Sequence, residues 1–122
     1  MATIRAYTTV EQSKKLAEIL PLESADMVYI ASANDDIGDT LYTAEYKSEI
    51  IIKEGDTDYI NCWSLASLFN VLPHIQEFYP TIEKINDKYV CRYKNSGIWT
   101  NGDNPVDACY EVILNLHDLK LL

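Results

Sequence analysis

The sequence predicts an α+β fold, a small two-layer single domain with antiparallel hairpins. Three observations favour this class. Two apolar runs with helical spacing end at prolines, Pro21 and Pro73. A strong helix start, residues 104–107 (NPVD), lies near the C-terminus. Short β-rich segments separated by turn residues fill the intervals between these helices. The predicted order of elements is therefore α-β-β-α-β-β-β-α.

The first helix is expected over residues 9–20. Thr8 stands three positions before Glu11, which is the spacing of a capping box. In a capping box, each of the two side chains accepts a hydrogen bond from the backbone N–H of the other residue. Apolar residues then follow at helical spacings. Pro21 ends the run, because the residue before a proline is pushed out of the α region.

A hairpin is expected next, formed by residues 27–31 and 41–53. The stretch between these segments, residues 34–39 (NDDIGD), is rich in turn-forming residues. Within the second segment, residues 50–52 are three isoleucines, so both faces of that strand are apolar. Such a run is typical of a central strand that is covered on both sides.

The second helix is predicted over residues 61–72. Leu65, Leu68, Phe69 and Leu72 share one face at helical spacing, and Pro73 ends the run. We expect this helix to be buried over much of its circumference.

Three strands and a last helix complete the chain. The strands are expected at 80–85, 88–94 and 97–101, joined by tight hairpin linkers. The helix is expected over 105–118, where Asn104 caps it and Asp107 complements its positive end. Its apolar residues recur at i, i+3, i+4 and i+7, so one face packs on a sheet or a neighbouring helix.

Size and cysteine usage favour one intracellular domain. The chain has 122 residues, is 48% hydrophobic and contains no low-complexity linker, so a single domain spanning 1–122 is expected. Cys62, Cys91 and Cys109 lie in apolar stretches and in no paired spacing, which is typical of buried free thiols. No secretory signal or apolar run of about 18 residues is found, so we expect a cytoplasmic protein without membrane contact.

The charge is acidic and unevenly placed. Residues 1–58 contain 12 acidic and five basic residues, whereas residues 59–122 contain seven and five, giving net charges of −7 and −2. This balance argues against direct binding to nucleic acid or to anionic lipid, because both require clustered lysine and arginine. A basic protein partner is favoured, although the acidic residues also suit the simpler role of keeping a small domain soluble.

No motif for catalysis, metal or cofactor binding is found. His74 follows a helix-ending proline and His117 lies near a helix C-terminus, where it complements the helix dipole. The acidic residues 35, 36 and 39 do not follow the calcium-loop pattern, because Gly38 is misplaced for it. The phosphate-loop motifs are absent. We therefore predict no cofactor, no metal and no catalytic residue.

Tyrosines give the clearest candidate binding surface. The segments 42–46 (YTAEY) and 89–93 (YVCRY) each place two tyrosines on the same strand face, Tyr42 with Tyr46 and Tyr89 with Tyr93. Tyrosine combines apolar area with a polar tip, which suits a binding surface. The same residues also suit the rim of an ordinary core, and the sequence leaves both interpretations open.

Three blocks of the sequence carry a resemblance. They are residues 20–27, which contain Leu20-Pro21 and Ser24-Ala25-Asp26-Met27, residues 62–66 (CWSLA) running into Leu72-Pro73, and residues 104–109 (NPVDAC). In these blocks the chain resembles short uncharacterised proteins of phages and integrated mobile elements from gut bacteria. The resemblance implies a genomic setting and no activity. Ser24 and Asp26 lie in a loop and Trp63 is large enough to anchor a partner, so these residues join the candidate surface.

These observations lead to competing hypotheses of function. The first is a non-catalytic interaction or accessory protein of a phage or mobile element, whose acidic face docks a protein partner. The second is a small-molecule-binding or sequestering protein, compatible with a homo-oligomer, which uses the tyrosine faces with Trp63 or Trp99 around a pocket. A hydrolase or transferase built on His74, His117 or a carboxylate pair is the weakest, because no spacing supports it.

Overall fold

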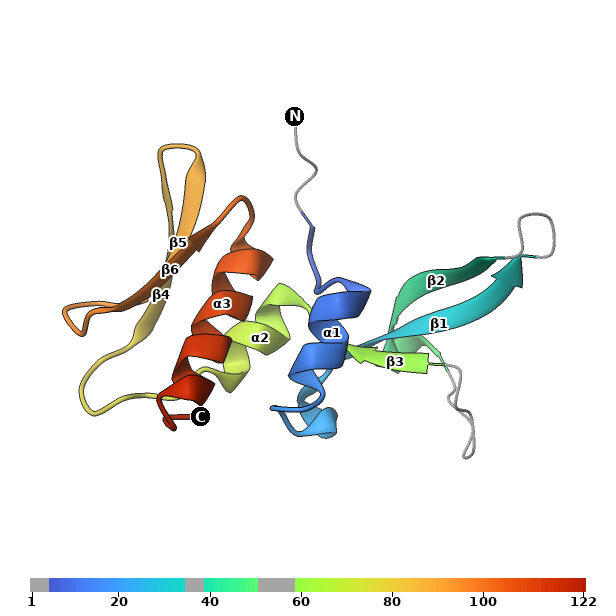
Figure 1. Cartoon of the computed structure of the whole chain (residues 1–122), viewed down its shortest axis with the longest axis horizontal. Coiled ribbons are helices and arrows are strands. Elements are labelled where there is room, and N and C mark those ends of the chain that lie inside the picture. The colour runs from blue at the N-terminus through green and yellow to red at the C-terminus, as the bar shows by residue number, and fades with distance from the viewer. Residues whose placement is uncertain (1–4, 35–38, 51–58) are drawn as a thin grey trace. The chain divides into compact units, whose positions relative to one another are not determined.

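A computed structural model describes residues 5–34, 39–50 and 59–122 of the chain (Figure 1). It contains three α-helices and two three-stranded antiparallel sheets, which confirms the predicted α+β class. The chain divides into two compact units. Unit 1 comprises Met1–Thr8 and Ser64–Leu122, and unit 2 comprises Thr9–Trp63. This division does not test whether the units fold independently, so a single domain stays a prediction.

Unit 2 is built on a sheet with the strand order β2-β1-β3. Its elements are α1 (Val10–Leu16), the 3-10 helix η1 (Leu22–Ser24), β1 (Met27–Asn34), β2 (Asp39–Tyr46), the 3-10 helix η2 (Lys47–Glu49) and β3 (Tyr59–Cys62). β1 pairs along its whole length with β2, and its first four residues also pair with β3. The short helix α1 lies beside β3 (Figure 1). Leu16, Val28 and Trp63 are the largest fully buried side chains of this unit.

Unit 1 is a two-layer arrangement of a sheet and a helix. Its elements are α2 (Leu65–Val71), β4 (Pro80–Ile85), β5 (Lys88–Tyr93), β6 (Ile98–Gly102) and α3 (Pro105–Asp118). The sheet order is β4-β5-β6, and α3 packs against β5 and β6 (Figure 1). Helix α3 contributes six buried residues, among them Val106, Cys109 and Ile113. The apolar face predicted for residues 105–118 is therefore the face that meets the sheet.

The connection between β6 and α3 requires a residue without a side chain. A Cβ atom at Gly102 would lie 2.9 Å from the Asp107 Cβ atom and 3.0 Å from the Ala108 backbone nitrogen. Such distances are shorter than normal van der Waals contacts. Gly102 thus allows the chain to turn from the last strand directly into the helix that covers the sheet.

The first helix differs from its prediction in start and in length. Thr9, not Thr8, is the N-cap, and its capping partner is Gln12 in place of Glu11. The helix ends at Leu16, and turns fill the interval up to Pro21. The predicted cap was therefore wrong by one residue. Thr8 is fully buried instead.

The second predicted helix is shorter than expected, because its first residues form a strand. Asn61 and Cys62 belong to β3, and Ser64 caps α2 by accepting a hydrogen bond from the backbone N–H of Ser67 at 3.2 Å. Of the predicted face only Leu68 and Leu72 are buried, while Phe69 is 36% exposed. The strand expected over 41–53 ends at Tyr46, where η2 begins. The isoleucines 51 and 52, which predicted a central strand, lie outside the described residues.

Among the described residues, no helix has the length and apolar character needed to cross a membrane.

Candidate functional site

Tyr42 and Tyr46 lie on the surface of unit 2. Their side chains are 42% and 44% exposed, on strand β2. The register places them opposite Ala31 and Met27 of β1, so both rings lie on one face of the sheet with Ala44 between them. We call residues Tyr42, Ala44 and Tyr46 the tyrosine surface. It is the most exposed part of the predicted site.

A buried ring supports this surface. Tyr29 of β1 is 8% exposed and meets Tyr42 edge to face, with ring centroids 6.4 Å apart and an interplanar angle of 86°. Aromatic rings prefer this geometry because the positive edge of one ring meets the negative face of the other. Tyr42 is thereby held against the sheet, and a partner that contacts it meets a positioned ring.

Of the second predicted pair, Tyr93 belongs to the core of unit 1 and Tyr89 lies at its border. Tyr93 is 1% exposed, and its hydroxyl donates a hydrogen bond to the carbonyl oxygen of Pro73 at 2.6 Å. Burial raises the pKa of Tyr93 well above its ordinary value. Tyr89 is half-buried, with the ammonium group of Lys84 5.8 Å from its ring centroid. The core interpretation therefore applies to Tyr93, and the surface interpretation to Tyr42 and Tyr46.

Trp63 and Ser24 are brought together within unit 2. The Trp63 side chain is fully buried, and its Nε1–H donates a hydrogen bond to Ser24 Oγ at 2.9 Å. Ser24 Oγ in turn donates to the carbonyl oxygen of Pro21 at 2.5 Å. This chain of hydrogen bonds holds η1 against the end of β3. In this structure the Trp63 ring is a packing element of the unit and offers no surface to a partner.

Asp26 lies next to Lys47 in the same unit. Its carbonyl oxygen accepts a hydrogen bond from the Lys47 backbone N–H at 3.0 Å. Burial lowers the pKa of Lys47, and the negative charges of Asp26 and Glu23 oppose that change. Asp26 therefore compensates a partly buried lysine, the residue that follows Tyr46 in the chain.

An exposed tryptophan marks a second surface, on the sheet of unit 1. Cys91 of β5 faces α3, so residues of opposite alternation, Val90 and Arg92, lie on the other face of the sheet, where Trp99 is paired with Arg92. Trp99 is 57% exposed. It borders a shallow depression of ≈ 320 Å³, whose lining includes Ile85, Val90, Arg92 and Trp99.

An ion pair crosses the same face of this sheet. Arg92 donates from Nε and from a terminal nitrogen to Oε1 of Glu83, at 2.9 and 2.8 Å. The hydrogen bond from Arg92 lowers the pKa of Glu83, and burial acts in the opposite direction. From the sequence, Trp99 was predicted only as an alternative pocket residue. Val90 and Arg92 could have been placed on the same face as Trp99 from the two-residue alternation of β5 and β6. That step requires Cys91 and Cys109 to be assigned to the interior first.

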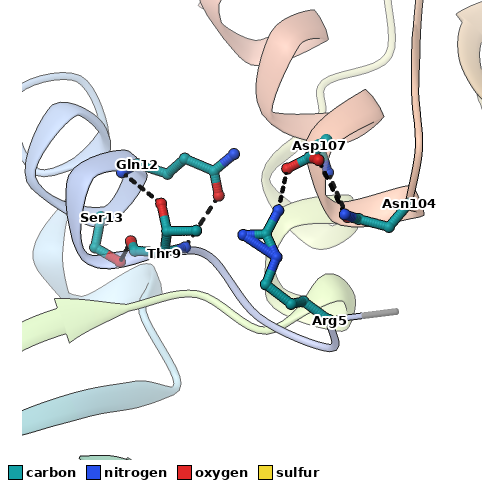
Figure 2. A network of polar contacts seen from close by, with 6 residues as sticks. All are labelled: Arg5, Thr9, Gln12, Ser13, Asn104 and Asp107. Carbon is teal, nitrogen blue, oxygen red and sulfur yellow. Dashed lines mark hydrogen bonds and ion pairs between the residues drawn. The ribbon is translucent and has the colours of Figure 1, made fainter. Parts of the chain in front are cut away.

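Arg5 and Asp107 form a polar network at the start of α3 (Figure 2). An Arg5 terminal nitrogen lies 2.5 Å from Asp107 Oδ1, and Asn104 Nδ2 donates to Asp107 Oδ2 at 2.9 Å. Asn104 Oδ1 accepts from the Asp107 backbone N–H at 3.0 Å, which confirms Asn104 as the helix cap. The figure also draws the separate capping box of α1, formed by Thr9 and Gln12. Both groups cap the first turn of a helix.

The two histidines occupy separate exposed positions. His74 meets Tyr79 edge to face with ring centroids 4.8 Å apart, and His117 lies in the last turn of α3. No ion pair with an acidic residue is found for either among the residues described. The acidic loop that does not follow the calcium-loop pattern includes residues 35 and 36, which lie outside the described residues. In the described ranges, no three His, Cys, Asp or Glu side chains are grouped so that they could hold a metal ion.

The cysteines are buried and free, as their apolar surroundings predicted. Cys109 of α3 donates a weak hydrogen bond to Cys91 of β5, with 3.8 Å between the sulfur atoms. That hydrogen bond and burial raise the pKa of the Cys109 thiol well above its ordinary range. Cys109 is therefore a neutral packing group at physiological pH.

No protein-family model, no curated protein and no solved structure matches this chain.

Proposed function

We propose that the chain is a non-catalytic interaction protein, an accessory protein of a phage or mobile element, whose acidic unit 2 docks a basic protein partner. The observation that carries this proposal is the separation of charge between the two units. Unit 2 contains 12 acidic and four basic residues, a net charge of −8, whereas unit 1 contains seven and six, a net charge of −1. Nearly all of the net negative charge of the protein therefore lies in unit 2.

Such a field acts on binding in a defined way. Like charges confined to 55 residues attract a basic surface over about one Debye length, roughly 8 Å at physiological ionic strength. This attraction raises association rates and selects against acidic partners. Several of the carboxylates, including those of Glu11, Glu23 and Glu49, belong to exposed residues. Exposed charge that is mostly acidic, in the same unit as the tyrosine surface, is the combination expected of a docking face, in which aromatic rings supply contact area.

Two variants of equal net charge test this proposal. The triple substitution E11Q/E23Q/E49Q removes three exposed charges from unit 2, and E77Q/D87N/E111Q removes three from unit 1. Immobilised wild-type protein is incubated with host lysate at low ionic strength and eluted with about 0.5 M salt, at which surface electrostatics are screened. We expect the wild type and the unit 1 variant to retain the same basic partner and the unit 2 variant to lose it. Equal retention or equal loss in the two variants would reject the proposal.

A second candidate function is the binding of a small molecule, and the depression beside Trp99 favours it. Its volume of ≈ 320 Å³ falls at the lower end of small-ligand sites. A half-exposed indole next to a guanidinium group suits a flat aromatic ligand, which stacks on the ring.

Thermal shift with a library of metabolites and nucleotides tests this candidate. A shift that W99A abolishes assigns binding to the depression. A shift that survives W99A and is lost in Y42S/Y46S assigns it to the tyrosine surface. No shift with any compound would contradict small-molecule binding.

A further inference from the structure

Strand β2 has one edge that no described strand pairs. All eight of its residues are in register with β1 on one side, from Asp39 opposite Asn34 to Tyr46 opposite Met27. The order β2-β1-β3 places β2 at the border of its sheet. An edge of this length presents a row of backbone N–H and C=O groups that can accept a further strand.

The other edge strands of the described residues carry features that hinder pairing, whereas the only such features of β2 are its acidic residues Asp39 and Glu45, which do not repel a basic strand. Proteins keep edges from pairing by making them short or by placing proline or lysine on them. β3 has only four residues, and β6 has five. β4 begins with Pro80 and carries Lys84 in its interior. β2 is the longest of the four and contains neither proline nor lysine.

The two faces of β2 differ in chemistry. One face has the exposed rings of Tyr42 and Tyr46 on either side of the small Ala44 side chain, so an apolar side chain of a neighbouring strand can pack on Ala44. The other face has Thr43 and Glu45, so an acidic group lies on that side. A complementary strand would thus alternate apolar and basic residues.

We propose that an extended basic segment of a partner protein adds to the free edge of β2 as a fourth strand of the unit 2 sheet. This inference rests on the proposed function and specifies how the basic partner is held. Backbone hydrogen bonds to β2 supply affinity, an apolar side chain of the added strand packs on Ala44, and Glu45 pairs with a lysine or arginine. Pairing of β2 with a second copy of this chain is disfavoured, because it would bring together two units with a net charge of −8 each.

The probe for this inference is an eight-residue peptide of alternating lysine and valine, which matches the length of β2. The control peptide alternates lysine and proline. It has the same charge, but its prolines donate no hydrogen bond and disfavour strand pairing. Binding of both peptides to the full chain is measured by calorimetry at low ionic strength, together with backbone hydrogen exchange of β2.

Two protein variants with the same change of charge separate strand addition from simple attraction. T43K places a lysine on the exposed edge, and A17K places one at the exposed end of α1. We expect the lysine-valine peptide to slow hydrogen exchange in β2 and T43K to weaken its binding by about tenfold or more, because an edge lysine blocks pairing. A17K should weaken it by less than about threefold, the effect of one surface charge. Unfolding midpoints of both variants confirm that each is folded.

The outcomes for the two proposals differ. Equal binding of the two peptides, equal loss of affinity in T43K and A17K, or exchange that slows outside β2 would reject strand addition while leaving the electrostatic proposal intact. Wild-type protein that self-associates through β2 in place of binding the peptide would also reject it. If neither peptide binds, the proposed function and strand addition are both rejected.

Discussion

The hydrogen bond between Trp63 and Ser24 gives the first prediction at the scale of single residues. S24A removes the acceptor of the indole N–H of a fully buried ring. A buried donor that loses its partner costs about 1–3 kcal/mol, so we expect the free energy of unfolding to fall by at least about 1 kcal/mol. Urea unfolding of S24A, W63F and the double variant measures the coupling between the two side chains, which should be about 1 kcal/mol.

Ser48 provides the matched control for this cycle. It is an exposed serine of η2, just as Ser24 lies in η1. We expect S48A to change the free energy of unfolding by less than about 0.5 kcal/mol, as is usual at surface positions. An S24A effect no larger than that of S48A would show that the hydrogen bond contributes little to the stability of unit 2.

Tyr93 predicts a loss of stability at alkaline pH. Its pKa is raised in the folded protein by burial, whereas in the unfolded chain it stays near 10. The stability contributed by the neutral hydroxyl is therefore complete below about pH 10 and is lost as pH rises beyond it, by up to about 1.4 kcal/mol per pH unit. Unfolding in urea at intervals between about pH 8 and 11 follows this loss, and Y93F should reduce the slope above pH 10.

The control for Y93F is Y79F, which removes the hydroxyl of a side chain that is 62% exposed. We expect the free energy of unfolding of Y79F to fall with pH as steeply as that of the wild type. The buried Cys109 thiol acts in the same direction as Tyr93 but from a lower pH, because an unfolded thiol ionises near 8.5. A slope above pH 10 that is identical in wild type and Y93F would contradict the role assigned to the Tyr93 hydroxyl.

Helix α3 carries the prediction at the scale of elements. Asn104 caps it, and N104A removes both the acceptor for the Asp107 N–H and the donor to the Asp107 carboxylate. The loss of such a cap costs about 1–2 kcal/mol. N104S retains an oxygen that can cap the helix, so we expect it to recover at least half of the lost stability in chemical denaturation. Equal destabilisation by N104A and N104S would show that the cap is not what Asn104 contributes.

The elements that could be predicted from the sequence are those with strong local signals. Asn104, Pro105 and Asp107 together define the start of α3, and the structure confirms the helix over Pro105–Asp118. The strands β4, β5 and β6 agree with their predictions to within one residue at each end, because turn residues separate them. In both cases the signal lies within a few residues of the element it defines.

The elements that were missed depend on partners distant in sequence. β3 is four residues long and forms by pairing with β1, which begins 32 residues earlier in the chain. Its residues Asn61 and Cys62 continue directly toward an apolar helical pattern, so local spacing assigned them to the helix. The N-cap of α1 shows a different limit. Thr8 and Thr9 each have an acceptable capping partner three residues on, and only burial of Thr8 decides between them.

The candidate site was predictable in part. Alternation along a strand correctly paired Tyr42 with Tyr46 and Tyr89 with Tyr93, but it cannot say which face meets a helix. The face of Tyr93 is covered because Cys91, on the same side, packs on Cys109 of α3. Likewise, the residues of the blocks that carry the resemblance prove to have structural roles, since Ser24 holds Trp63 and both Ser64 and Asn104 cap helices.

At the scale of the whole molecule, the division into units sharpens the charge asymmetry. A sequence split after residue 58 gives −7 and −2, whereas the structural units have −8 and −1. The difference arises chiefly because the N-terminal segment belongs with the C-terminal half. Tyr7 forms a β-bridge with Ser64, and Arg5 pairs with Asp107. No local signal in residues 1–8 indicates these contacts, which span more than 50 residues of sequence.

This asymmetry predicts that salt acts differently on the two units. A net charge of −8 destabilises unit 2 through self-repulsion, whereas unit 1 is nearly neutral. Raising the salt concentration from about 0.05 to 0.5 M shortens the Debye length from roughly 14 to 4 Å and screens that repulsion. On raising the salt concentration, backbone hydrogen exchange should slow more in β1 and β3 of unit 2 than in β5 and α3 of unit 1. Unit 1 thus serves as the internal reference in the same molecule. The E11Q/E23Q/E49Q variant should show a smaller salt effect in unit 2, because less repulsion is left to screen. Equal salt effects on the two units would contradict this electrostatic account and, with it, the role of unit 2 as the charged face.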